Sequence, residues 1–332
     1  MTPALEVRDL RVRLATPTGP VTIVDGIDLT VAPGEIAGIA GESGSGKTIA
    51  MLALLGLLPP GATVEGSACV NGRELLGLSE RELRAVRGHE LAMIFQDPLA
   101  SLHPMLTIGR QLTEHLTAHL GLRGRAARGR AAELLAEVRL PDPDGALDRY
   151  PHEFSGGMRQ RIAIAIALAC GPSVLIGDEP TTALDVTVQA GILRLLDRLR
   201  RENGTAIVLV THDLGVMSAI ADSVTVFYAG RIVETGARAE ILTRPRHPYT
   251  AGLLAALPSG ELDGAPVAPI PGVPPTPQQR PPGCAFHPRC THRTASCERD
   301  VPPLEPLGDG RLLACPPDPF APAGALGERS AS

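Results

Sequence analysis

The chain contains 332 residues, of which 44% are hydrophobic and 20% are charged, and its formal net charge is −5. This composition is typical of a globular protein, and the length allows one large domain with an appendage, or two domains. The acidic balance excludes the basic footprint of a nucleic-acid-binding protein, so we expect no nucleic-acid partner.

The first part of the chain alternates short strand-like runs with helical patterns, which predicts an α/β domain with a parallel sheet. Residues 5–14 and 21–31 alternate apolar and polar side chains, as half-buried antiparallel strands do. Residues 35–41 read as a buried strand, and residues 46–58 as the apolar helix that follows it. Residues 107–140 have helical spacing and predict a helical insertion in the α/β core.

Nothing in the pattern predicts a segment that crosses a membrane. The N-terminus has an acidic residue, Glu6, and no apolar stretch of the secretory kind, so we expect a cytoplasmic protein. The longest uncharged apolar run, residues 162–177, is too short to cross a bilayer. We therefore expect any role at a membrane to depend on partner proteins.

Residues 41–48 read GESGSGKT, which fits the phosphate-loop pattern G-x-x-x-x-G-K-[ST] at a predicted strand-to-helix turn. Such glycines let backbone N–H groups surround phosphate oxygens, and the next helix points its positive end at them. Lys47, the only lysine in the chain, would reach the β- and γ-phosphates, and Thr48 would bind Mg²⁺. The predicted phosphate-binding residues are Gly41, Ser43, Gly44, Ser45, Gly46, Lys47 and Thr48.

Two further predicted strands end in polar residues. Residues 173–180 read SVLIGDEP, so Asp178 would hold Mg²⁺ and Glu179 would polarise the water that attacks the γ-phosphate. His212 follows the predicted strand 205–210 and would donate a hydrogen bond to the γ-phosphate. A surface Asp-Glu turn and a structural histidine are the alternatives to these roles.

A second anion-binding turn, Ser155-Gly156-Gly157, opens the predicted helix after Phe154. The chain therefore carries two separate phosphate-binding elements. Either it binds two phosphates, or the second element serves a nucleotide held by another chain.

Six motifs, in this order along the chain, resemble those of the ATP-binding cassette (ABC) family. GESGSGKT resembles its Walker A loop, IFQDP its Q-loop with Gln96, FSGGMRQR its signature motif, VLIGDEP its Walker B strand, TALD with Asp185 its D-loop, and VTHD its switch histidine. The resemblance implies a P-loop NTPase cassette with a RecA-like parallel-sheet core, an antiparallel β subdomain and a helical subdomain at about residues 99–165.

The same resemblance implies ATP and Mg²⁺ as ligands, with Gln96 beside the metal and Glu179, His212 and Gln96 as catalytic residues. It also implies a head-to-tail dimer, in which ATP lies between the Walker motifs of one cassette and the Ser155–Gly157 turn of the other. Asp185 would lie at that shared site. A dimer explains the second phosphate-binding element.

The end of the chain differs in composition. Residues 258–332 hold 17 of the 32 prolines and four of the six cysteines, with little periodic apolar sequence for a core. A metal or cluster is the natural cross-link for such a segment in a cytoplasmic protein. Four thiolates suit Zn²⁺ or an iron-sulfur cluster, and four unligated thiols are the third possibility. These cysteines are Cys284, Cys290, Cys297 and Cys315.

Residues 244–258 and 282–290 resemble the C-terminal extension of the oligopeptide, dipeptide and nickel branch of importer ATPases. Some members of that branch hold a [4Fe-4S] cluster on such cysteines, so we favour [4Fe-4S] over Zn²⁺. The expected organisation is a nucleotide-binding domain, residues 1–257, followed by a Pro-rich extension, residues 258–332. We expect His247, Pro248 and Tyr249 to seat this extension on the cassette.

The resemblance implies the ATP-hydrolysing subunit of an importer for di- or oligopeptides, at the cytoplasmic face of the membrane. Its partners would be a second, related cassette subunit, two transmembrane permeases and, indirectly, an extracellular substrate-binding protein. An importer of nickel or another small solute is the alternative within this branch. A cassette ATPase that acts on nucleic acid or ribosomes is a further alternative, which the single cassette and the acidic chain disfavour.

One departure from the family generates a prediction. The family places an aromatic ring ahead of the Walker A loop to stack on adenine, but no Phe, Tyr or Trp precedes Phe95 here. An aliphatic residue near Leu14 or Val21 would pack there instead. We expect GTP to compete with ATP better than is usual for the family, and strict ATP preference in a nucleotide competition assay would contradict this.

Overall fold

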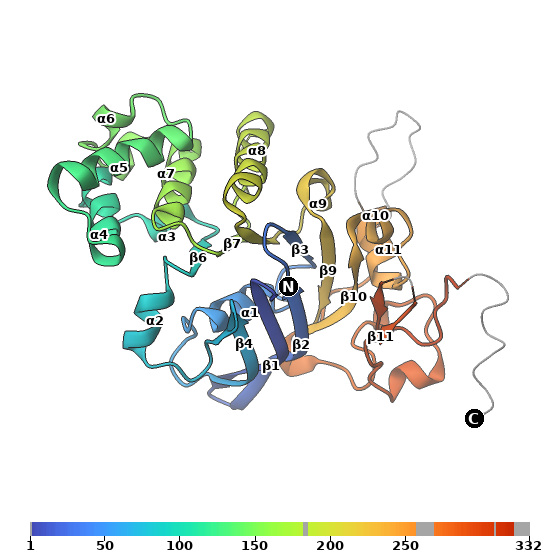
Figure 1. Ribbon diagram of the computed structural model, residues 1–332. Helices are drawn as coiled ribbons and strands as arrows, with labels where there is room; N and C mark the ends of the chain where they lie inside the picture. The colour runs from blue at the N-terminus through green and yellow to red at the C-terminus, as the bar shows by residue number, and fades with distance from the viewer. Residues whose placement is uncertain (1, 182–184, 257–268, 309, 322–332) are drawn as a thin grey trace.

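The computed structural model describes residues 2–181, 185–256, 269–308 and 310–321. The boundary expected at residues 257 and 258 lies outside this part of the chain. Two sheets and a separate group of helices make up the fold (Figure 1). The larger sheet contains, in spatial order, β11 (Glu305–Pro306), β12 (Leu312–Leu313), β10 (Arg231–Ala237), β9 (Ser223–Tyr228), β3 (Ile36–Ala40), β8 (Ala206–Val210), β7 (Val174–Asp178) and β6 (Leu91–Ile94).

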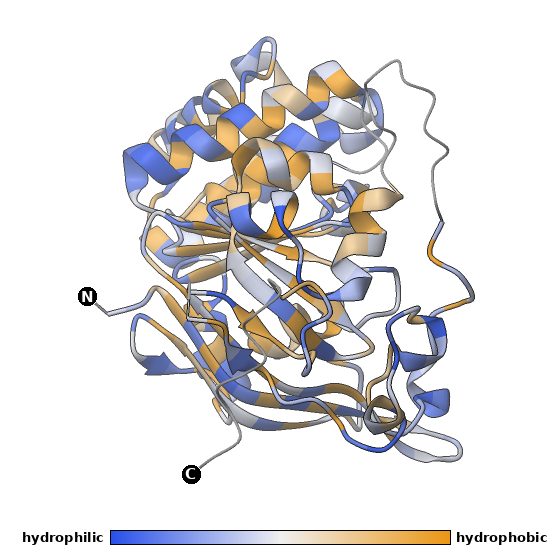
Figure 2. Ribbon diagram, turned by 90° about the vertical axis from the view of Figure 1, so that its right-hand side faces the viewer, coloured by the Kyte–Doolittle hydropathy of each residue, from blue (hydrophilic) through white to orange (hydrophobic). Residues whose placement is uncertain are grey.

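The parallel centre of the larger sheet carries the predicted α/β core. β3 pairs in parallel with β8 and β9, and β7 pairs in parallel with β8 and β6. Every residue of β3, β7 and β8 is buried, because layers on both faces cover these apolar runs. Figure 2 shows hydrophobic strands running through the middle of the molecule. The buried strand predicted at residues 35–41 is confirmed.

The smaller sheet is antiparallel and forms the predicted β subdomain. Its order is β2 (Gly19–Val31), β1 (Leu5–Thr16), β4 (Thr63–Val70) and β5 (Arg73–Glu74). Helix α1 (Lys47–Leu54) belongs to the core that joins the two sheets. It is shorter than the helix predicted at residues 46–58, because Gly56 adopts a left-handed φ of 62° soon after the last turn.

The helical subdomain lies beside the sheets and confirms the predicted insertion (Figure 1). Its elements are α3 (Pro98–Ser101), α4 (Ile108–Leu120), α5 (Gly124–Glu137), α6 (Pro143–Ala146), η1 (Pro151–Glu153) and α7 (Gly156–Leu168). The remaining helices are α2 (Glu80–Val86), α8 (Val186–Asn203), α9 (Leu214–Ile220), α10 (Arg238–Thr243) and α11 (Pro248–Ala255).

The described part of the extension packs on the cassette. Its short turns are η2 (Pro277–Gln279), η3 (His287–Arg289) and η4 (Ala295–Glu298), and its strand β12 pairs with β10 of the larger sheet. Phe286 is 3% exposed, and its ring centroid lies 5.2 Å from Tyr228, 5.3 Å from Tyr249 and 5.9 Å from His247. The extension thus shares the cassette's core, and His247 and Tyr249 help to seat it, as predicted.

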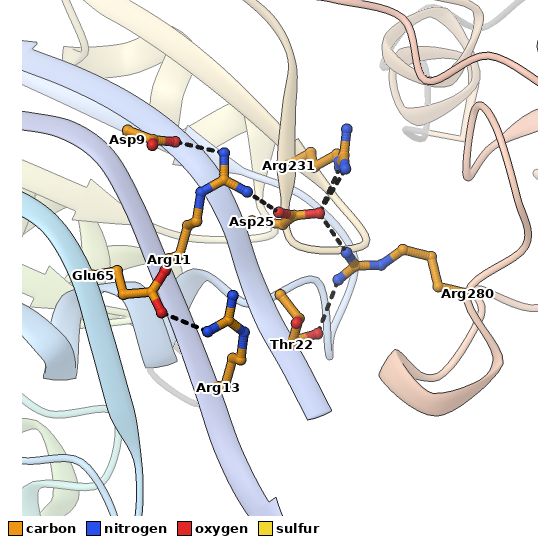
Figure 3. A network of polar contacts seen from close by, with 8 residues as sticks. All are labelled: Asp9, Arg11, Arg13, Thr22, Asp25, Glu65, Arg231 and Arg280. Atoms are coloured by element: carbon orange, nitrogen blue, oxygen red, sulfur yellow. Dashed lines mark hydrogen bonds and ion pairs between the residues drawn. The ribbon is translucent and has the colours of Figure 1, made fainter. Parts of the chain in front are cut away.

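A second junction joins the extension to the smaller sheet through Asp25 of β2 (Figure 3). Its carboxylate accepts from Arg11 at 2.8 Å, from Arg231 at 2.6 Å and from Arg280 at 3.2 Å. Arg280 follows η2 and also donates to the carbonyl oxygen of Thr22 at 3.1 Å. One carboxylate therefore holds three arginines that come from three distant parts of the chain.

We expect Asp25→Asn to lower the free energy of unfolding by about 2 kcal/mol, since it leaves partly buried arginines without their shared anion. Asp9→Asn is the matched control, because Asp9 pairs with Arg11 and its side chain is 66% exposed, against 15% for Asp25. Urea denaturation measures both variants. Equal effects of the two substitutions would contradict the role of Asp25.

Candidate nucleotide site

The phosphate loop, residues 41–48, leads from the end of β3 into the first turn of α1, as predicted. Gly41 has a φ of +148°, and a Cβ atom at this position would overlap the carbonyl oxygen of Phe227 in β9. Gly46 precedes α1 with a left-handed φ of +101°. These two positions require glycine because one has no room for a side chain and both have backbone angles that side chains disfavour.

Lys47 folds back into the loop. Its Nζ donates to the carbonyl oxygens of Gly41 at 2.7 Å and Glu42 at 2.9 Å, and to Ser45 Oγ at 3.3 Å. Burial lowers the pKa of Lys47, while the carboxylates of Glu179 and Asp178 act in the opposite direction. A compact ammonium fits this enclosed position, whereas a planar guanidinium would need a different loop.

Asp178 and Thr48 meet at the carboxyl ends of the parallel strands of the larger sheet. Thr48 Oγ1 donates to Asp178 Oδ1 at 3.2 Å. Asp178 is 4% exposed, and burial raises the pKa of its carboxyl group. A hydroxyl and a carboxylate side by side are the hard oxygen ligands that Mg²⁺ prefers, and a bound cation would favour the ionised carboxylate.

Glu179 brings the predicted catalytic residues together. Gln96 Nε2 donates to Glu179 Oε2 at 3.0 Å, and His212 Nδ1 lies 2.9 Å from Glu179 Oε1. Because an ionised carboxylate only accepts, His212 donates through Nδ1. Glu179 has a φ of 49°, in the left-handed region that non-glycine residues rarely adopt, so its backbone is strained at the site.

The second predicted phosphate-binding element lies on another subdomain. Ser155 caps α7, where its side chain accepts from the backbone N–H of Met158 at 3.4 Å, and Ser155 and Gly156 are exposed. Asp185 caps α8 in the same way, through the N–H of Val188 at 2.9 Å. Between described residues, no hydrogen bond links the Ser155–Gly157 turn to the phosphate loop.

Leu14 and Val21, the residues suggested for adenine packing, are cross-strand partners in β1 and β2 and are half-buried. Their role toward adenine stays a prediction. Glu42, by contrast, was missed by the motif analysis. Its N–H donates to Tyr249 Oη at 2.8 Å and its carboxylate pairs with Arg289. No local pattern connects residues so far apart in the sequence.

The four cysteines of the extension line one cavity of about 210 Å³. All four are free thiols. Burial raises the pKa of Cys284 and Cys290, and burial together with the neighbouring thiols raises that of Cys315 to about 12. Within the described part of the chain, no group of three or more His, Cys, Asp or Glu side chains is arranged to hold a metal ion. The predicted cysteines thus converge without forming a coordination shell.

Comparison with known proteins decides the family. The ABC transporter family matches residues 24–182, and the C-terminal region of oligopeptide/dipeptide transporters matches residues 233–297. The oligopeptide transport ATP-binding protein OppD of Salmonella typhimurium is 50% identical over 311 residues, which cover 94% of this chain and 92% of that protein. The chain belongs to the ABC transporter family. As an ABC ATPase it binds and hydrolyses ATP.

Other relatives agree with this ABC assignment. The dipeptide transport ATP-binding protein DppD of Bacillus subtilis is 44% identical, over 95% of each chain. A solved dimeric ATP-binding cassette in a post-hydrolysis state, bound to ADP and Pi, superposes with a TM-score of 0.64 at 27% identity. The superposed region covers 70% of this chain and 98% of the solved cassette. The predicted cassette fold is confirmed.

None of the helices in the described ranges is both long and apolar enough to span a membrane.

The geometry around Glu179 generates a prediction. We expect Glu179→Gln to lower ATP turnover of the assembled transporter by at least about a hundredfold, because the amide cannot accept the proton of the attacking water. MgATP binding should persist. Glu202→Gln is the control, because Glu202 is an exposed acidic residue at the end of α8. Near-normal steady-state ATPase activity of Glu179→Gln would show that Glu179 is not the base.

Proposed function

We propose that this chain is the ATP-hydrolysing subunit of an importer for di- or oligopeptides. One observation carries the proposal: Gln96 and His212 both contact Glu179 in a chain whose C-terminal region matches oligopeptide/dipeptide transporters. The two curated relatives described above are named for oligopeptide and dipeptide transport. A nickel or other small-solute importer is the alternative within the same branch.

The proposed mechanism uses both phosphate-binding elements. The phosphate loop, with Lys47, would hold the β- and γ-phosphates, and Thr48 and Asp178 would hold Mg²⁺ with Gln96 beside it. Glu179 would accept a proton from the attacking water, and His212 would turn its N–H from Glu179 to the γ-phosphate. The exposed Ser155–Gly157 turn and Asp185 would face the ATP of a partner cassette, so ATP closes the dimer and hydrolysis reopens it.

The helical subdomain supports contact with a permease. Gln96 leads through Asp97 directly into α3, where Leu99 is 51% exposed, and Met105 beyond it is 76% exposed. The same subdomain has a groove of about 440 Å³, which is lined by residues of α3, the α3–α4 connection, α4 and α7. Because this surface continues from Gln96, a permease segment seated there would sense the catalytic site. The chain would thus act peripherally at the cytoplasmic face of the membrane.

We infer a sulfur-ligated group for the cysteine cavity from the four thiols that line it. A volume of about 210 Å³ exceeds the needs of a single ion, since one water occupies only about 30 Å³. His247 lines the cavity, and its Nδ1 accepts from the N–H of Tyr249 at 3.1 Å, which leaves the proton on Nε2. Among the residues that the structure describes, that buried Nε2 has no hydrogen-bond partner, and burial lowers the pKa of His247 to about 3. An anionic group in the cavity would satisfy this orphaned donor.

We propose a [4Fe-4S] cluster there, held by Cys284, Cys290, Cys297 and Cys315, with Zn²⁺ as the alternative. Such a cluster would cross-link segments of the extension that have little core of their own. His247 would orient it by hydrogen bonding to sulfur. A structural role explains the thiols without any redox function.

Transport assays test the proposed function. Cells that lack this subunit should fail to take up labelled di- and oligopeptides, and the wild-type subunit should restore uptake. Lys47→Ala should not restore it, because the phosphate loop loses its cation. Loss of nickel uptake with peptide uptake intact would favour the alternative importer.

The cysteine cavity gives a further prediction. Protein purified without oxygen should contain iron and acid-labile sulfide, and Cys297→Ser should lose them while Cys69→Ser, outside the cavity, keeps them. Loading should strengthen as pH rises, because ligation displaces protons from thiols whose pKa is raised. Colourless protein with stoichiometric zinc would overturn the cluster, and metal-free wild-type protein would overturn both assignments.

A further inference from the structure

Glu42 is the one acidic residue of the phosphate loop, and its charge opposes that of the triphosphate that the loop would bind. The structure pairs its carboxylate with Arg289, whose Nη1 lies 2.6 Å from Oε2 and whose Nη2 lies 3.0 Å from Oε1. The pair is bidentate, which is the strongest geometry for arginine and carboxylate. The two partners are 247 positions apart in the sequence.

Arg289 is held rigidly for this contact. Its side chain is 5% exposed, against 26% for Glu42. Nε donates to the carbonyl oxygen of Pro271 at 2.8 Å, and Nη1 donates to Tyr228 Oη at 3.3 Å. Its guanidinium carbon also lies 5.8 Å from the ring centroid of Phe286. A guanidinium fixed in this way keeps its positive charge beside the Glu42 carboxylate.

The contact matters because the backbone of Glu42 is held at the predicted nucleotide site. Its N–H donates to Tyr249 Oη, and its carbonyl oxygen accepts from Lys47 Nζ at 2.9 Å. An unpaired carboxylate here would repel phosphate and would also attract Lys47 away from it. Neutralisation of Glu42 is therefore a condition for tight binding of an anion by this loop.

We propose that Arg289 of the extension is a positioning residue of the nucleotide site, which acts by neutralising Glu42 and so sets the affinity for MgATP. The proposal rests on the assignment of residues 41–48 as the phosphate loop under the proposed function. Through Arg289, the extension would contribute to nucleotide binding in addition to packing on the cassette.

The same contact connects the nucleotide site with the cysteine cavity. Arg289 immediately precedes Cys290, which lines the cavity, and Tyr249 follows two residues after His247, which also lines it. Arg289 and Tyr249 thus both belong to segments that bound the cavity. Displacement of either segment would release Glu42.

MgATP binding to the full-length chain tests the proposal. Arg289→Met should weaken binding at least about fivefold, the lower end of ordinary coupling between sites. The double variant Arg289→Met with Glu42→Gln should recover most of the affinity, because no uncompensated carboxylate is left. The loss in Arg289→Met should also shrink at high salt, which screens the repulsion.

Arg280→Met is the matched control, because Arg280 also ties the extension to an acidic residue of the cassette, and Asp25 keeps two other arginines. It should change MgATP affinity less than about twofold, the size of a weak surface effect. Wild-type affinity of folded Arg289→Met would overturn the proposal. So would equal weakening in Arg289→Met and in the double variant, since that result means a purely structural role.

Two more variants, Glu42→Gln and Lys47→Ala, test the proposal and the phosphate-loop assignment separately. Glu42→Gln alone should bind MgATP at least as tightly as wild type even if Arg289→Met fails to fold, and a fivefold weakening by Glu42→Gln would overturn the proposal. Lys47→Ala should abolish binding. If it does not, the phosphate-loop assignment itself fails, which is distinguishable from failure of Arg289 alone.

Discussion

The nucleotide site depends on the register of three parallel strands. Beyond the strand ends, Thr211 N–H still donates to the carbonyl oxygen of Ile39 at 3.1 Å, and Glu179 N–H donates to that of Val210 at 2.8 Å. These bonds bring the residues after β3, β7 and β8 to one edge of the sheet. A shift of one residue would turn each polar side chain to the other face, so the predicted catalytic residues meet only in this register.

Much of this arrangement could be predicted from sequence, because short buried strands and glycine-rich turns leave strong local patterns. The phosphate loop and Asp178 lie where the pattern places them, at strand ends. The extension was harder to predict. Its link to the larger sheet is the short β12, and its anchor in the core is Phe286, so neither produces a periodic signal. Arg289 could not be identified, because only the tertiary fold brings it to Glu42.

The seam between cassette and extension concentrates the chain's scarce aromatic residues. The sequence has three tyrosines and five phenylalanines, yet Tyr228, Tyr249 and Phe286 pack against one another at this one place. Aromatic side chains bury more apolar surface than any others, so a few of them can fix a segment that has little core. The junction at Asp25 adds a polar contact between the extension and the smaller sheet. The C-terminal segment thus packs as part of the cassette core and also forms an ion pair with the smaller sheet.

The arginine-rich composition has a practical consequence. Apart from the terminal amino group, Lys47 supplies the chain's one primary amine. It is 6% exposed, and its lowered pKa increases the fraction of nucleophilic free amine. An amine-selective acylating reagent small enough to enter the loop would therefore mark a single internal position. Mass spectrometry of that one modification would report occupancy of the phosphate loop in the unaltered protein, with no engineered probe.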